Sequence, residues 1–245
     1  MADIPSSALA GAAASAASLS RVVLDLLAAL PTNPSTAQAV GRDVRRAALL
    51  APRIALPADV GTIGRILTRS VRDLARAAPP ADASAALYET AARARDTYPR
   101  SASPVLTRAY RLAQALATGL EVSCLGEAFL AEARSSFADR PSGDRARARI
   151  AAAMDASGDR IAGLLGRAVY GALNKVALQT GSYLAQEVAT LRPVVRVEAL
   201  ASRPSTALAY ALYGDPARGA ELVARNAVGT PLFCGPTLEA LSPAP

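Results

Sequence analysis

Apolar residues recur at helical spacing through the first four fifths of the chain. The clearest stripe occupies positions i, i+3, i+4, i+7, i+8 and i+11, and it consists of Leu19, Val22, Val23, Leu26, Leu27 and Leu30. Six prolines interrupt the helical pattern: Pro31, Pro52, Pro57, Pro79, Pro80 and Pro99. Because proline ends helices, we predict helices over residues 6–30, 35–50, 60–78 and 82–98, with Asp59 as the cap of the third.

Two longer helices are predicted in the middle of the chain. The fifth begins at Ser103-Pro104 and extends to about residue 138, and Gly119 and Gly126 are the positions where it could bend. After Pro141-Ser142-Gly143, the sixth helix spans residues 144–191 without interruption. Ile150, Ile161, Ala172 and Tyr183 recur there every eleven residues. Eleven residues over three turns favour a nearly straight packing seam.

The second half of this sixth predicted helix, residues 161–191, carries few charges. A helix that is apolar all round is usually buried on several sides. It also contains several glycines, which weaken an exposed helix and therefore indicate close contacts with neighbours. We therefore predict that residues 1–192 form an elongated bundle of long, alanine-rich helices, part of which is buried against other subunits of a homo-oligomer.

The last fifty residues have a different pattern. Val194, Val195 and Val197 form a β-branched run that predicts a strand. Ser205 or Thr206 can cap a short helix that Gly214 ends, and Asp215 can cap a second helix with Pro216 at its first position. Residues 237–241 can return as a second strand. Residues 193–245 are therefore predicted to form a small β-α-α-β domain after a boundary at Arg192-Pro193.

The amino-acid sequence of this segment resembles that of a known module. It is similar to the LysM-like module of phage tail proteins, and more closely to the C-terminal end of the DNA circularization (circulation) protein, the N protein of Mu-like phages and prophages. The resemblance covers about one sixth of the chain. The residues that carry it are Leu208, Ala209, Leu212, Tyr213, Gly214, Asp215, Arg218, Ala220, Glu221, Val223, Ala224, Arg225, Asn226, Pro231, Gly235, Leu238, Glu239 and Leu241. Cys234 stands where the family tends to have a proline.

The resemblance implies a structural protein of the phage tail, in the baseplate or hub region of the virion, made in the host cytoplasm. Its partners would be other tail and baseplate proteins. Family members usually begin with a β-rich domain, whereas this chain starts directly in the helical part, so a docking role of that domain is not transferred. LysM modules of cell-wall proteins bind N-acetylglucosamine chains, and in tail proteins the module often connects proteins. We favour the connector, and peptidoglycan remains the alternative partner. The interaction residues of the module would be Tyr210, Tyr213, Gly214, Asp215, Arg218, Arg225 and Asn226, although Tyr213 is expected to fill the small core.

Charge adds a further candidate surface. The formal net charge is +7, and Lys175 is the only lysine. The third predicted helix carries Arg65, Arg69, Arg72 and Arg76 at spacings of 4, 3 and 4, which places them on one face. Such a face could track the phosphates of DNA, which leaves a DNA-binding or circularizing protein as an alternative function. No aromatic residues interleave with these arginines to stack on bases. We therefore favour an outward face that meets water or carboxylates.

Catalytic chemistry is not indicated. The chain has no histidine, which removes Ser-His and Cys-His pairs and the commonest metal ligand. Cys124 and Cys234 are too few for a four-ligand zinc site, and we expect two unpaired thiols. Asp155 and Asp159 share a helix face but have arginines nearby for ordinary surface pairing. We therefore expect no enzyme, no cofactor and no metal.

Serines, Arg21 and Asp25 interrupt the apolar run of residues 8–30, so we expect no membrane span.

Overall fold

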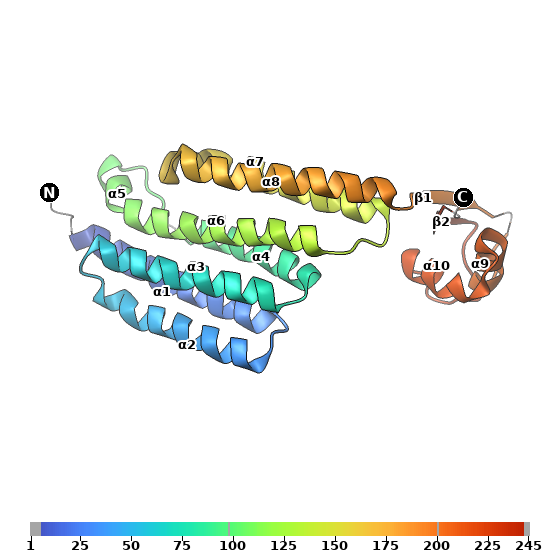
Figure 1. The fold of residues 1–245 in the computed structure, drawn as a ribbon, viewed down its shortest axis with the longest axis horizontal. Helices are drawn as coiled ribbons and strands as arrows, with labels where there is room; N and C mark the ends of the chain where they lie inside the picture. The colour runs from blue at the N-terminus through green and yellow to red at the C-terminus, as the bar shows by residue number, and fades with distance from the viewer. Residues whose placement is uncertain (1–5, 98, 200, 243–245) are drawn as a thin grey trace. The chain divides into compact units, whose positions relative to one another are not determined.

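The computed structural model describes residues 6–97, 99–199 and 201–242. They form two compact units. The first comprises the described residues up to Ser135 together with Ala148–Tyr183, and the second comprises Ser136–Arg147 together with the described residues from Leu184 onward. The prediction of a mainly helical protein with a small β-α-α-β domain at its C-terminal end is confirmed (Figure 1). The predicted boundary at Arg192-Pro193 falls inside the second unit.

Prolines lie at the starts of three of the first four helices. These four helices are α1 (Ser6–Ala29), α2 (Pro34–Leu50), α3 (Pro57–Ala77) and α4 (Pro80–Asp96), and a 3-10 turn, η1 (Ala51–Arg53), follows α2. Proline stands in the first turn of α2, α3 and α4, where its missing N–H would have had no helical partner. The predicted end of the fourth helix at Tyr98 lies outside the described residues.

The start of α3 corrects one prediction. Asp59 is not the N-cap residue, because Pro57 already lies in the first turn and the cap position belongs to Leu56. The Asp59 carboxylate instead accepts hydrogen bonds from the backbone N–H groups of Ala55 and Leu56. These hydrogen bonds lower the pKa of Asp59.

The core of the first unit is built on α1 and α6 (Arg111–Arg134). Helix α1 is long and apolar enough to cross a membrane, but most of its apolar stripe is buried within the bundle, and Leu19 and Val23 are fully buried. Helix α6 contributes the buried side chains of Leu120, Cys124 and Phe129. Alanines between these large side chains allow the helices to pack closely, as the alanine-rich composition predicts.

Three buried glutamates of α6 pair with arginines of two other helices. Arg72 of α3 pairs with Glu127. The other two glutamates meet α7 (Arg140–Leu165): Arg149 and Ser84 donate to Glu132, and Arg160 and Ser157 donate to Glu121. Burying a carboxylate is costly unless it is paired and hydrogen-bonded. These glutamates therefore fix the positions of the helices around α6.

The fifth predicted helix is two helices. A short helix, α5 (Pro104–Ala109), precedes α6, and the break lies at Tyr110. Helix α6 continues without a break through Gly119 and Gly126 and ends at Arg134 rather than near residue 138. The prediction of one continuous helix was wrong because neither proline nor glycine marks the break at Tyr110.

The sixth predicted helix is a helical hairpin. Helix α7 ends at Leu165, Gly166 has a positive φ of 86°, and α8 (Arg167–Thr190) follows. Near the start of α7 the N–H of Arg140 donates to the carbonyl of Arg192, and near its end Gly158 lies against the ring of Tyr170. The two helices are therefore antiparallel, and the eleven-residue recurrence does not form one seam. Pro141 and Gly143, which were predicted to lie in a break, are in the first turn of α7.

The module at the C-terminus is a two-stranded antiparallel sheet with helices between the strands. Strand β1 (Val194–Glu198) pairs with β2 (Thr237–Leu241) in a register that places Arg196 opposite Glu239. Between them lie α9 (Ser205–Tyr213), the 3-10 turn η2 (Pro216–Arg218) and α10 (Gly219–Arg225). Gly214 ends α9 with a φ of 69°, and the Asp215 carboxylate accepts from the N–H of Ala217, as predicted.

Candidate functional site

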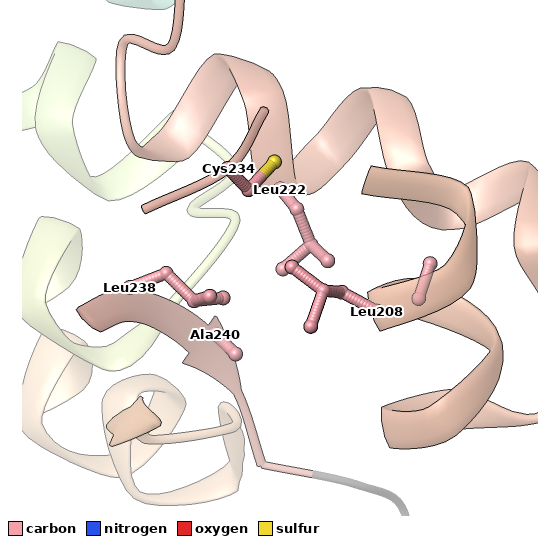
Figure 2. Packing of buried hydrophobic residues seen from close by; sticks show 6 residues of the cluster. Leu208, Leu222, Cys234, Leu238 and Ala240 are labelled. Atoms are coloured by element: carbon pink, nitrogen blue, oxygen red, sulfur yellow. The ribbon is translucent and has the colours of Figure 1, made fainter. Parts of the chain in front are cut away.

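The module has a core of its own. Two leucines from the helices, Leu208 and Leu222, point toward one another, while Leu238 and Ala240 of β2 and the thiol-bearing Cys234 surround them (Figure 2). Tyr213 packs against this core, which confirms the position predicted for it. The predicted cap of α9 is wrong: the cap position is Pro204, and Ser205 is buried in the first turn.

Backbone hydrogen bonds join the two loops of the module. Arg203 and Cys234 exchange a pair of backbone hydrogen bonds, and the Ser202 hydroxyl also donates to the Cys234 carbonyl. The N–H of Ser205 donates to the carbonyl of Pro231 at 2.7 Å. These loops are therefore held together by the chain itself, and Cys234 occupies the buried position between them.

Most of the large polar side chains predicted as an interaction surface are engaged with other residues of the chain. The guanidinium carbon of Arg218 lies 3.6 Å from the centre of the Tyr213 ring. The same guanidinium donates two hydrogen bonds to Glu221, at 3.0 and 2.7 Å. Burial and the nearby Glu221 carboxylate raise the pKa of Tyr213. One face of the tyrosine ring is thus covered, and the charge on Arg218 is neutralised locally.

Arg225 extends this network. Its guanidinium donates to Asp139, just before α7, at 2.6 Å, and lies 3.8 Å from Glu221. Asp139 also accepts from the N–H of Ser142. Burial acts to raise the pKa of Asp139, but the hydrogen bonds from Arg225 and Ser142 outweigh burial and lower it. Asp139 had no place in the predicted site, because its partner is distant in sequence.

Asn226 ties α10 to the sheet. Its side-chain amide donates to the carbonyls of Leu222 and Glu239, and its side-chain oxygen accepts from the N–H of Glu239 at 2.7 Å. Gly219 has a comparable structural role, since a Cβ there would lie 3.1 Å from the backbone nitrogen of Thr206. Both residues hold the helices of the module in place, so Asn226 belongs to its framework rather than to an open binding surface.

Of the predicted module residues, Tyr210 is the one large side chain that is strongly exposed, at 65%. The loop between α10 and β2 adds two exposed apolar residues that the sequence analysis had not selected, Leu232 at 61% and Phe233 at 68%. Aromatic residues such as Tyr210 and Phe233 are enriched at protein interfaces.

The arginine face of α3 is exposed as predicted. Arg65 donates to the hydroxyl of Thr62, and Arg69 forms an i, i+4 ion pair with Asp73. Arg72 pairs with Glu127, and within the described residues Arg65 and Arg76 form no ion pair. The surface is therefore only partly neutralised.

Metal and thiol chemistry have little support in the described part of the chain. No group of three or more potential ligands that could hold a metal occurs there. Cys124 and Cys234 are both buried and free, and burial raises the pKa of the Cys124 thiol, which makes it unreactive. No known protein-family model and no curated protein matches the chain.

Proposed function

We propose that this protein is a structural component of a phage tail, in the baseplate or hub region. In this proposal the helical part assembles with other tail subunits, and the C-terminal LysM-like module connects it to neighbouring tail proteins. The role is not enzymatic. The observation that carries the proposal is the β1-α9-α10-β2 module, which has the element order of a LysM-like domain together with exposed apolar residues.

The internal engagement of the module favours a connector over a glycan binder. Sugars are held by hydrogen bonds and by aromatic rings that stack on them. Arg218 covers one face of Tyr213, and the side chains of Arg225 and Asn226 are bonded within the chain. Tyr210, Leu232 and Phe233 remain exposed and suit contacts with an apolar protein surface.

The surface of α8 supports assembly with further copies or subunits. One stripe of this helix is buried, and it includes Leu173, Leu184 and Val188. Leu178 and Tyr183 lie outside that stripe and are 64% and 45% exposed. A helix with few charges and exposed large apolar residues gains stability when a partner covers it.

Two measurements on the full-length protein test this proposal. Mass photometry should give a mass above that of the monomer, and the Leu178→Glu variant should lower it by placing a charge in the subunit contact. Co-sedimentation with insoluble peptidoglycan should leave the protein in the supernatant. A monomer that pellets with peptidoglycan would replace the connector with a cell-wall binder.

DNA binding is the second candidate, because the segment from α2 to α3 concentrates positive charge. Residues 34–77 contain eight arginines and three aspartates, a net charge of +5 out of +7 for the chain. A gel shift with duplex DNA at low and high salt tests it. Binding that is lost when Arg65, Arg69, Arg72 and Arg76 are replaced by alanine would support this candidate, and no shift at low salt would exclude it.

A further inference from the structure

An apolar groove lies between α3 and α6 on the first unit. Its volume is about 390 Å³, and its lining is almost entirely apolar. Val60, Leu67 and Leu116 contribute apolar side chains, whereas Gly61 and Gly119 leave it open. A Cβ on Gly119 would meet nothing within 4 Å, so contacts within the described chain do not require glycine there. Glycine inside a helix costs about 1 kcal/mol relative to alanine, and an occupant of the groove would account for it.

The arginine face of α3 runs beside this groove. Arg65 lines the groove itself, and Arg69, Arg72 and Arg76 continue along the same face of the helix. From Arg65 to Arg76 the face extends over about 16 Å of helix. Leu56, which precedes α3 and is 61% exposed, adds apolar surface at the end where Pro57 lines the groove. The surface is therefore apolar on one side and basic on the other.

This pairing of features defines the occupant. A small ligand would need polar groups inside the groove to orient it, and the lining offers few besides Arg65 and Thr68, whose hydroxyl donates to the Arg65 carbonyl. A nucleic acid would use the arginines but not the apolar groove. A second copy through the same surface would bring two basic faces together. An amphipathic helix with acidic residues along one edge matches both features, because its side chains recur every three to four residues, as the arginines do.

We propose that the groove between α3 and α6 binds an amphipathic helix of a partner protein, with apolar side chains in the groove and carboxylates against Arg65, Arg69, Arg72 and Arg76. This interaction surface lies on the helical unit. It goes beyond the function proposed above, which depends on the C-terminal module and on α8.

The test is a selection of surface-displayed helical peptides on the full-length protein. The library keeps apolar residues at i, i+3, i+4 and i+7, and randomises the flanking positions among acidic, basic and neutral residues. The selected peptides should carry acidic residues on one flank. The Gly119→Leu variant, which fills the groove, should weaken their binding at least about tenfold, and so should high salt or the paired Arg65→Ala and Arg69→Ala changes.

Gly163→Leu is the matched control. Gly163 is an exposed helical glycine of α7 whose added Cβ would also meet nothing within 4 Å, and it lies outside the groove. It should leave peptide binding unchanged. Gly61→Leu provides a second groove variant, since an added Cβ there would meet only the end of the Arg65 side chain. Circular dichroism of each variant checks that the helical unit is folded.

Three results would overturn the inference. One is a selection that enriches no peptide, or only neutral or basic ones. Another is peptide binding that does not respond to either groove variant. The third is a failed selection together with a DNA gel shift that needs the arginines, which would assign this face to nucleic acid. A negative result in the peptidoglycan or mass measurements would produce none of these three results. The proposed binding surface and the proposed function can therefore be contradicted independently.

Discussion

Arg225 donates a hydrogen bond to Asp139 at 2.6 Å, although 86 residues separate them in the sequence. Both side chains are mostly buried, with exposed fractions of 13% and 11%. Arg225 is the last residue of α10, and Asp139 immediately precedes α7 and accepts from the N–H of Ser142. A single carboxylate therefore starts a helix of the hairpin and holds a helix of the module.

The Asp139→Asn substitution separates these two roles. Asparagine caps a helix as well as aspartate does, so the loss should come from the ion pair with Arg225. We expect about 2 kcal/mol of destabilisation in the second unit, below the value for a fully buried pair because both groups keep some exposure. Hydrogen exchange of the α10 and β2 amides measures it. Asp144→Asn, which breaks an exposed pair with Arg147 on the same helix, should cost below about 0.5 kcal/mol. Equal losses would contradict the proposed importance of Asp139.

The same pair predicts a dependence on pH. Because the pKa of Asp139 is lowered in the folded protein, the unfolded chain takes up the proton more readily as the pH falls. The stabilisation is complete above the unfolded value of about 3.9 and is lost as the pH falls through the folded pKa. Amide protection in α10 and β2 should therefore decline in acid, and less steeply in Asp139→Asn. The same acid slope in both proteins would show that other groups cause the decline.

Two glycines of the hairpin should respond to alanine in opposite directions. A Cβ on Gly143 would collide with the side chain of Val188 on α8, whereas a Cβ on Gly163 would meet nothing within 4 Å. Gly143→Ala should lower the free energy of unfolding by about 1–3 kcal/mol through overpacking. Gly163→Ala should raise it by up to about 1 kcal/mol through helix propensity. Thermal unfolding of the two variants measures both, and a stabilised Gly143→Ala would contradict the close approach of α7 and α8.

Local signals in the sequence were enough for much of the fold. Prolines mark the starts of α2, α3 and α4, and the turn chemistry of Gly214 and Asp215 places the two helices of the module. These signals depend on the geometry of one or two residues, which is the same in any protein. These signals did not give the exact first residue of a helix, because the predicted caps Asp59 and Ser205 lie inside the first turn rather than before it.

The hairpin and the Asp139 pair needed tertiary information. Gly166 turns the chain, but it is one of five glycines in residues 158–181, and the apolar pattern continues on both sides of it. Each helix of the hairpin buries one stripe against its neighbours, so the pattern alone cannot distinguish one long helix from two short ones. Arg225 was selected as an interaction residue, but its partner follows from packing and not from spacing.

Asn226 provides a test of the module's framework. Asn226→Asp keeps the acceptor for the N–H of Glu239 but removes the amide that donates to the carbonyls of Leu222 and Glu239. Placing a carboxylate against these carbonyls should lower the free energy of unfolding by about 2 kcal/mol. Urea unfolding monitored at the backbone amides of β2 would detect this loss. Asn33→Asp is the matched control, because Asn33 only accepts, from Thr36 and Ser35, and aspartate caps equally well. A neutral Asn226→Asp would mean that the amide does not hold α10 to the sheet.

The central claim is that this protein is built into a phage tail and that its C-terminal module connects it there. The most direct measurement is immunogold labelling of phage tail particles isolated from cells that produce this protein, with an antibody against residues 193–245. The proposal predicts gold at one fixed position, the baseplate end of the tail. Particles that contain none of the protein, with all of it recovered as a free monomer, would contradict the account.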